Sequence, residues 1–294
     1  MKKSLALLLP AAFALFALSG CVTPSVESVV SMTMRHGENV SQAAHEFTPE
    51  EEFAIGRAVG ARIVSKYGAL QDQAANNYVN QLGQALAMRA GHSTPNGYHF
   101  LLLSSPEVNA FAAPGGLIFV TTGMVGLVSG ESQLAAVLAH EIGHVQNRDA
   151  VASIKTSRTT KAATALGADA AGSYTPSVPV PGGSEVLHLF SGAVDDVINT
   201  LVVSGYSRGQ EYAADAAATG ILRSAGYDPG ALAAVLQAMS QRVPAGSAGF
   251  GSTHPPAQDR LAKLGGSGAA TAKDTSVQAE RFRAALGKYS ASAR

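Results

Sequence analysis

Glu131-Ser-Gln-Leu-Ala-Ala-Val-Leu-Ala-His-Glu-Ile-Gly-His-Val-Gln-Asn147 is the stretch around which we expect the rest of the chain to fold. Its apolar residues recur at helical spacing and no proline interrupts them, so the pattern predicts a helix. The second half contains His140-Glu141-Ile142-Gly143-His144, an HExxH pattern. Residues four apart lie on one face of a helix, so both imidazoles can point at one metal ion. Glu141 then stands beside that metal, where it can accept a proton from a bound water.

Gly143 is an unusual residue inside a helix, because glycine costs about 1 kcal/mol of helix stability relative to alanine. We therefore expect another element, or a substrate, to approach the helix closely at this point. A chance match of five residues is the alternative explanation of the HExxH pattern.

A catalytic zinc ion needs a third protein ligand and an open position for water. The best candidates lie in Ser207-Arg-Gly-Gln-Glu-Tyr-Ala-Ala-Asp215, where Glu211 and Asp215 share one face of an Ala-rich helix. If Glu211 ligates zinc, Asp215 can accept a hydrogen bond from the far ring nitrogen of a zinc histidine. A solvated acidic face is the alternative.

His254 stands in a His-Pro-Pro sequence between a Gly/Ser-rich loop, 244–253, and a helix that starts near Ala257. One interpretation is a helix-entry turn whose prolines fix the backbone. The other is that His254 folds over the zinc cleft, as a fourth ligand in a resting state or as a donor to the transition-state oxyanion. Arg208 is a second candidate for that donor.

The β-structure is predicted to be small. Residues 98–103 and 116–121 have the composition of strands, and Asn109-Ala-Phe-Ala-Ala-Pro-Gly-Gly116 lies between them. Pro114 suits an edge strand or a turn, and an extended peptide can pair with an exposed edge through main-chain hydrogen bonds. An ordinary hairpin is the alternative.

The other predicted elements are helices. Thr48-Pro49-Glu50-Glu51 opens the first of them as a capping box with proline at the first helical position. The predicted helical ranges are 48–67, 72–89, 151–166, 185–203 and about 276–286. Residues 167–184 are rich in Gly, Ser and Pro and are predicted to form a long loop, either a lid or a linker.

Composition places the chain among globular proteins. At 294 residues and 46% hydrophobic content it is long enough for one large domain or two small ones. The formal net charge is zero and no Lys/Arg-rich block occurs, which argues against a nucleic-acid partner.

The first residues differ in kind from the rest. Lys2 and Lys3 precede an apolar run, 5–18, which ends in Leu-Ser-Gly before Cys21. This pattern is typical of a secretory signal, and the run is too short for a comfortable membrane span. Cys21, the chain's single cysteine, resembles the lipidated residue of a bacterial lipobox, and Val22 rather than Asp after it favours sorting to the outer membrane. An ordinary buried cysteine is the alternative.

Together these motifs resemble the HExxH metallopeptidases of family forty-eight, the group of the HtpX, Oma, BepA and LoiP type. The resemblance covers residues 48–264 in family order, and the motifs that match are Glu52 to Arg57, Asn109 to Ala112 with Pro114-Gly-Gly, His140 to His144 with Arg148-Asp149, and Ser207 to Asp215. Neither a cluster of membrane-spanning segments, as in the HtpX-like branch, nor a tetratricopeptide-type repeat region, as in BepA, is evident. The first departure favours the periplasmic lipoprotein branch.

The resemblance implies a mainly helical α+β, zincin-like (gluzincin) domain with a small antiparallel sheet or hairpin beside the active-site helix. It implies one Zn²⁺ per chain, held by His140, His144 and Glu211, with Glu141 as general base and Asp215 as the supporting carboxylate. The substrate is expected to lie on the edge formed by Asn109, Ala110, Phe111 and Ala112.

We therefore expect a signal peptide over 1–20, a lipidated tether over 21–47, a zinc endopeptidase domain over 48–264 and a C-terminal tail over 265–294. Its partners would be polypeptide substrates and, through a lipid on Cys21, the periplasmic face of the outer membrane. The rival hypothesis is a lipoprotein chaperone or assembly factor whose zinc is structural. Glu141 favours the enzyme, because a structural site has four protein ligands and no use for a base beside the metal.

Overall fold

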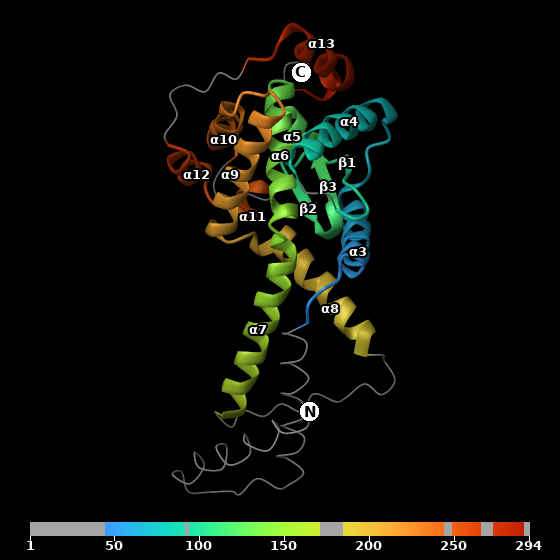
Figure 1. Cartoon of the computed structure of the whole chain (residues 1–294), viewed down its shortest axis with the longest axis vertical. Helices are drawn as coiled ribbons and strands as arrows, with labels where there is room; N and C mark the ends of the chain where they lie inside the picture. Colours follow the sequence, from blue (N-terminus) through green and yellow to red (C-terminus); the bar gives the residue numbers. More distant parts are fainter. Residues whose placement is uncertain (1–44, 92–93, 171–184, 244–248, 266–272, 291–294) are drawn as a thin grey trace, which may run out of the picture.

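Helices surround one small sheet in this protein (Figure 1). The computed structural model describes residues 45–91, 94–170, 185–243, 249–265 and 273–290. The expected mainly helical α+β class is confirmed. Cys21 and residues 171–184 of the predicted loop lie outside the described residues.

The sheet has three strands in the order β1-β3-β2, with β1 at His99–Leu103, β2 at Ala110–Ala113 and β3 at Leu117–Thr121. β2 and β3 form an antiparallel hairpin across the 3₁₀ turn η2 (Pro114–Gly116), whereas β1 pairs with β3 in parallel. The expected antiparallel hairpin is therefore confirmed, and the parallel strand β1 makes the whole sheet mixed. Apolar side chains on both faces of β3 suit the central position, which leaves the Ala-rich β2 at the edge.

Side chains alternate across this sheet between two hydrophobic clusters. Phe100, Leu102, Ala110, Ala112, Ile118 and Val120 face the first cluster, together with α4 and α6. Leu103, Phe111, Ala113 and Phe119 face the second cluster, together with α3, α7 and α8. The sheet is thus buried on both faces, and α6 lies directly against it.

Eleven helices of the described residues, besides the short 3₁₀ and π turns, build these layers. They are α3 (Pro49–Tyr67), α4 (Gln73–Arg89), α5 (Thr122–Leu127), α6 (Glu131–Gln146), α7 (Asp149–Ala170), α8 (Glu185–Asn199), α9 (Arg208–Ser224), α10 (Gly230–Arg242), α11 (Phe250–Thr253), α12 (Ala257–Lys263) and α13 (Ser276–Leu286). The predicted capping box of α3 is confirmed, because Thr48 Oγ1 accepts from Glu51 N–H and Glu51 accepts from Thr48 N–H.

Two segments that were predicted as loop are helical instead. α7 continues to Ala170, four residues into the predicted loop, because the small residues of 167–170 are compatible with a helix. Residues 250–253, which were predicted as loop, form the short helix α11. Phe250 at its start is buried, and this anchors a turn that composition alone does not reveal.

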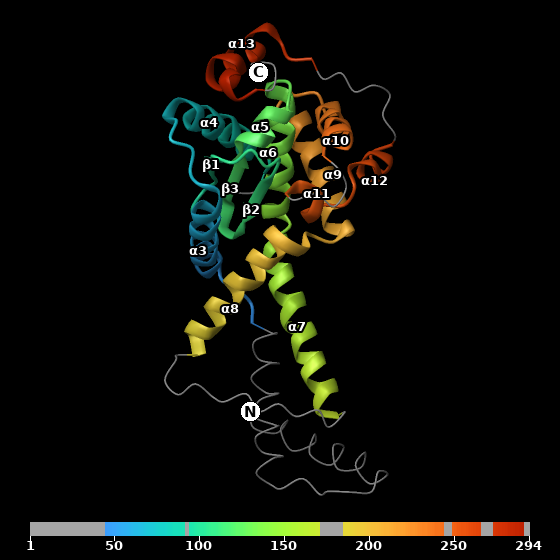
Figure 2. The same cartoon turned by 180° about the vertical axis from the view of Figure 1, so that it is seen from behind.

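α7 and α8 extend away from the rest of the molecule in both views (Figures 1 and 2). The π-helical turn η3 (Thr200–Ser204) leads from α8 back to the body of the protein, where α9 begins. Among the helices in the described part of the chain, none is long and apolar enough to cross a bilayer.

Candidate metal centre

The candidate site is built where α9 packs against α6. A Cβ added at Gly143 would lie 3.0 Å from the carbonyl oxygen of Ala214 and 3.1 Å from its Cα. Any larger residue at this position would push the two helices apart. The structure thus shows which element approaches the glycine in the HExxH motif: it is the helix that carries the acidic pair.

Four side chains converge at this contact. Ligand atoms of His140, His144, Glu211 and His254 all lie within 4.8 Å of one another, and all four side chains are buried. The Glu211 carboxylate oxygens lie 3.6 Å from His140 Nε2 and 3.7 Å from His144 Nε2. His254 Nδ1 lies 2.7 Å from Glu211 Oε1. α6, α9 and the residue after α11 therefore each supply part of one cluster.

The outer ring nitrogens of both motif histidines face carboxylates. His144 Nδ1 lies 2.7 Å from Asp149 Oδ2, and His140 Nδ1 lies 3.0 Å from Asp215 Oδ1. Such a carboxylate accepts the Nδ1 proton, which fixes the ring and leaves the Nε2 lone pair free. From the sequence, Asp149 was recognised only as part of the Arg148-Asp149 motif, and its contact with His144 was not predicted.

This donor set fits a divalent metal ion. With both Nδ1 protons given to carboxylates, His140 Nε2 and His144 Nε2 hold lone pairs only 3.1 Å apart, an arrangement that favours a cation against both. Both Glu211 oxygens and His254 Nδ1 are also buried and, among the described residues, form no hydrogen bond of good geometry, although His254 Nδ1 and Arg260 Nη1 lie 2.7 Å and 3.3 Å from the Glu211 carboxylate. Buried polar atoms of this kind need an explanation, and a shared ion supplies one. Two imidazoles and a carboxylate match the ligands of zinc.

Glu141 lies beside the cluster and is 1% exposed. Its Oε1 is buried and, among the described residues, has no hydrogen-bond partner. Burial raises the pKa of Glu141 to about 7, so in the metal-free protein its carboxyl exchanges a proton near neutrality. Its buried position beside the cluster and its free oxygen suit a general base.

Arg260 of α12 underlies the acidic half of the site and was not predicted. Its side chain is 1% exposed; Nε donates to Asp215 Oδ2 at 2.9 Å and Nη2 donates to Asp215 Oδ1 at 2.5 Å. Nη1 lies 3.3 Å from Glu211 Oε2. Burial opposes the ionisation of Asp215, but hydrogen bonds from Arg260 and His140 outweigh it and hold the pKa of Asp215 below its usual range. A basic residue six positions after His254 is the only signal of this role in the sequence.

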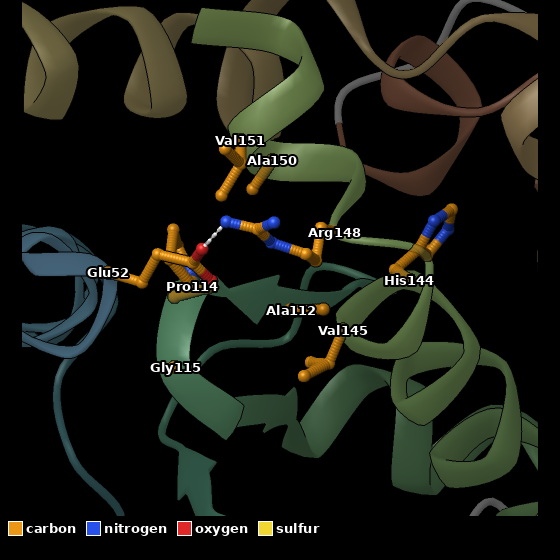
Figure 3. A pocket seen from close by; sticks show the side chains of 10 residues that line it. Glu52, Ala112, Pro114, Gly115, His144, Val145, Arg148, Ala150 and Val151 are labelled. Atoms are coloured by element: carbon orange, nitrogen blue, oxygen red, sulfur yellow. Dashed lines mark hydrogen bonds and ion pairs between the residues drawn. The ribbon is translucent and has the colours of Figure 1, made fainter. Parts of the chain in front are cut away.

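A small open pocket adjoins the cluster at the end of β2 (Figure 3). His144 and Val145 form one side of it, and Ala112, Pro114 and Gly115 form another. At its rim the Arg148 guanidinium donates to Glu52. Arg148 is a non-glycine residue with a φ of +54°, and this turn between α6 and α7 brings Asp149 next to His144.

The predicted substrate residues fall in two places. Asn109 to Ala112 lie at the edge of the sheet beside the metal cluster, and Ala110, Phe111 and Ala112 line a second small pocket together with Glu141 and His254. Arg208 lies apart from them: its side chain is 69% exposed, and it reaches Asp259 at 3.4 Å. The structure therefore brings the edge to the site but turns Arg208 toward α12.

Comparison with known proteins identifies the family of this chain. The sequence model of the family "Peptidase family M48" matches residues 73–267. The chain belongs to peptidase family M48. The resemblance found in the motifs is thus confirmed, and with it the zincin-like character of the domain.

Among its relatives in this family, the chain is 27% identical to the "Beta-barrel assembly-enhancing protease" of Yersinia pestis over 193 residues, 66% of this chain and 38% of the relative. It is 25% identical to the protein of the same name from Escherichia coli (strain K12) over 268 residues, 89% of this chain and 51% of the relative. It is 29% identical to the "Protease HtpX homolog" of Acidiphilium cryptum over 240 residues, 69% of this chain and 78% of the relative. The chain thus spans about half, or less, of the length of the first two relatives.

Proposed function

We propose that the protein is a zinc-dependent endopeptidase that a lipid on Cys21 holds at a bacterial envelope membrane. The observation that carries the enzymatic part is Glu141. Its carboxylate is buried beside the His140, His144 and Glu211 cluster and has one oxygen free among the described residues. A purely structural metal site has no use for such a group.

The proposed chemistry divides between the ion and the chain. A zinc ion held by His140, His144 and Glu211 would act as a Lewis acid, which makes water more acidic and polarises a peptide carbonyl. Glu141 accepts the proton of the attacking water at its free oxygen and then gives it to the leaving amine. Asp149 and Asp215 hold the two imidazoles in the tautomer that presents Nε2 to the ion. His254 is our candidate donor to the oxyanion, because it lies closer to the cluster than Arg208 does.

We place the substrate main chain along β2. This strand is at the edge of the sheet, is adjacent to Glu141 and His254, and can pair with an extended segment. Such pairing requires an unfolded stretch of polypeptide. The name of the relatives from Yersinia and Escherichia refers to β-barrel assembly, so we propose unfolded or unassembled envelope proteins as the substrate class.

The deciding experiment is cleavage of denatured casein by the purified chain, together with zinc quantitation by atomic absorption. We expect about one zinc per chain, loss of activity with a chelator and recovery with added zinc. Glu141→Gln should bind zinc but lose at least about a hundredfold in rate, because the base is gone. Glu50→Gln, an exposed glutamate of α3, is the matched control and should cleave normally. A zinc-free protein, or a Glu141→Gln variant as active as the parent, would exclude the proposal.

One observation favours the rival, a chaperone or assembly factor with a structural zinc site. His254 adds a fourth potential protein ligand to the cluster, and four protein ligands are the mark of a structural site. His254→Ala separates the two functions. An enzyme that His254 holds in a resting state should keep its zinc and change its rate or pH profile, whereas a structural site should release the metal. If His254→Ala changes neither rate, pH profile nor zinc affinity, His254 has no role at the metal.

A further inference from the structure

The register of the sheet shows which main-chain groups of β2 remain for a partner. Thr121 N–H donates to the Asn109 carbonyl, and the antiparallel ladder continues with Phe111 opposite Phe119 and Ala113 opposite Leu117. Hydrogen-bonded pairs alternate along such a ladder, so the main-chain groups of Ala110 and Ala112 point away from β3. These are the groups that an added strand must use.

Two of these outward groups already have partners within the protein. Ala110 N–H donates to the Asn109 side chain at 2.9 Å. The Ala112 carbonyl oxygen faces the Tyr206 hydroxyl, which donates to it across 3.5 Å. One of the two outward carbonyl acceptors, that of Ala112, is therefore occupied by a long, weak hydrogen bond from a side chain.

The Tyr206 ring covers the site as well as the edge. It stacks on the His144 imidazole with the ring centroids 4.3 Å apart and the planes inclined by 29°. It also lines the small pocket that Glu141, Ala112 and His254 share. One side chain thus contacts a candidate zinc ligand and the proposed substrate strand at once.

The π turn η3 and the helix α11 lie next to Tyr206 and hold it in this position. The π turn η3 precedes Tyr206; its residues Thr200 and Leu201 are buried, whereas Val203 is 64% exposed. At Gly205 (φ +73°) the chain crosses the end of α11, where an added Cβ would lie 2.1 Å from the Thr253 carbonyl oxygen. The π turn and α11 are therefore in direct contact. π turns are rare and occur often at functional sites.

We propose that Tyr206 is the gate of the substrate edge: its hydroxyl takes the place of a substrate amide on the Ala112 carbonyl, and it must leave before a peptide can pair with β2. This inference rests on the proposed function, because it assumes that β2 receives the substrate. The structure then shows the closed form, and the energy needed to open it weakens peptide binding. Removing the gate strengthens binding, whereas loss of a residue with a purely structural role weakens it.

The test uses the zinc-loaded full chain carrying Glu141→Gln, so that a peptide substrate binds without being cut. The probe is fluorescein-labelled denatured casein, and fluorescence anisotropy gives its Kd. Tyr206→Phe removes the hydroxyl and keeps the ring, so we expect the Kd to fall about twofold, the low end of a hydrogen bond's net contribution. Tyr206→Ala also removes the stacking on His144, so we expect a fall of about tenfold. Tyr212→Ala, a tyrosine of α9 beside Lys263, is the matched control and should leave the Kd unchanged.

A second readout uses the same substitutions in the chain that retains Glu141. The gate predicts a lower KM with kcat retained, because Tyr206 acts before the chemical step. An unchanged or raised Kd in both Tyr206 variants, with zinc content at the level of the parent, overturns the inference. A kcat that collapses in Tyr206→Phe also overturns it, because the hydroxyl would then act in the reaction itself. If the parent with Glu141→Gln binds no casein at all, the proposed function fails instead.

Discussion

The Arg260 guanidinium contacts three members of the candidate metal centre, Glu211, Asp215 and His140. Its two-point pair with Asp215 fixes the carboxylate that orients His140, and such supporting contacts typically contribute 10- to 100-fold to metal affinity. We therefore expect Arg260→Met to weaken zinc binding by about that factor, measured by competition with a chromophoric chelator. Arg260→Lys keeps the positive charge but lacks the planar group that makes two parallel hydrogen bonds, so it should retain only part of the zinc affinity. Lys263→Met, an exposed change on the same helix, is the control, and equal affinities in all three variants would refute the role.

We expect Glu141 to make the stability of the metal-free protein depend on pH. Because burial raises its pKa from 4.5 to about 7, the folded, metal-free protein keeps this proton over a range in which the unfolded chain has lost it. The contribution of the protonated Glu141 carboxyl to the free energy of unfolding is therefore fully present below about pH 4.5. It is lost as the pH rises through about 7, which lowers the free energy of unfolding by up to about 3 kcal/mol. Glu141→Gln, measured in chelator by urea unfolding, should gain stability relative to the parent between pH 5 and pH 8. A difference that stays constant over this range would contradict the prediction.

Single residues were predictable from sequence when their partners were local. His140 with His144 and Glu211 with Asp215 are pairs four apart on a helix, and helical geometry alone places each pair on one face. Asp149, Tyr206 and Arg260 act through contacts between different elements, and no local spacing reveals these. The zinc candidates were therefore visible in the sequence, whereas the residues that surround them required the fold.

At the scale of elements, the N-terminus of α6 shows how a distant segment supports the active-site helix. Its N-cap residue, Gly130, provides no side chain, and Asp274 accepts from Glu131 N–H at 2.7 Å and from Ser132 N–H at 2.9 Å instead. Arg281 of α13 also pairs with the fully buried Glu131. The predicted C-terminal tail therefore completes the helix that holds the HExxH motif, although Asp274 and Arg281 lie beyond the family match at 73–267.

Asp274→Ala removes this cap and should lower the free energy of unfolding by about 1 kcal/mol, as loss of a helix cap usually does. Denaturant unfolding monitored by circular dichroism gives the value. Glu280→Ala, an exposed acidic residue of α13, provides the control for charge and composition. Parent-like stability in Asp274→Ala would show that the cap is dispensable.

Elements with a strong pattern were foreseen, and those that depend on packing were not. The capping box begins α3 as predicted, because its hydrogen bonds involve only residues within a stretch of four. The position of β1 depends on β3 entering the centre of the sheet, which is decided by burial on both faces rather than by any turn. α11 escaped prediction for a related reason: the buried side chain of Phe250 holds a segment whose composition indicates a loop.

At the scale of the whole molecule, the site and the proposed membrane anchor are separate parts of the chain. The residues of the metal centre and the substrate edge fall between Asn109 and Arg260, within the family match, whereas Cys21 lies outside it. A substitution of Cys21 should therefore change where the protein is located without changing its peptidase chemistry. Two or more lipid chains hold a protein at a bilayer surface stably, so the proposed lipid on Cys21 is the attachment that a mutation should remove.

Cys21→Ser is thus expected to move the protein from the membrane fraction to the soluble periplasmic fraction in a Gram-negative host. Fractionation with immunoblotting measures the distribution, and labelling with a radioactive fatty acid shows whether the parent carries lipid. The purified Cys21→Ser chain should cleave denatured casein at the rate of the parent in detergent, because none of its site residues has changed. Ser19→Ala, a small-for-small change before the cysteine, is the control and should keep the protein on the membrane. A Cys21→Ser chain that remains in the membrane fraction would show that the attachment has another source, and a lost peptidase rate would show that the N-terminal segment takes part in building the site.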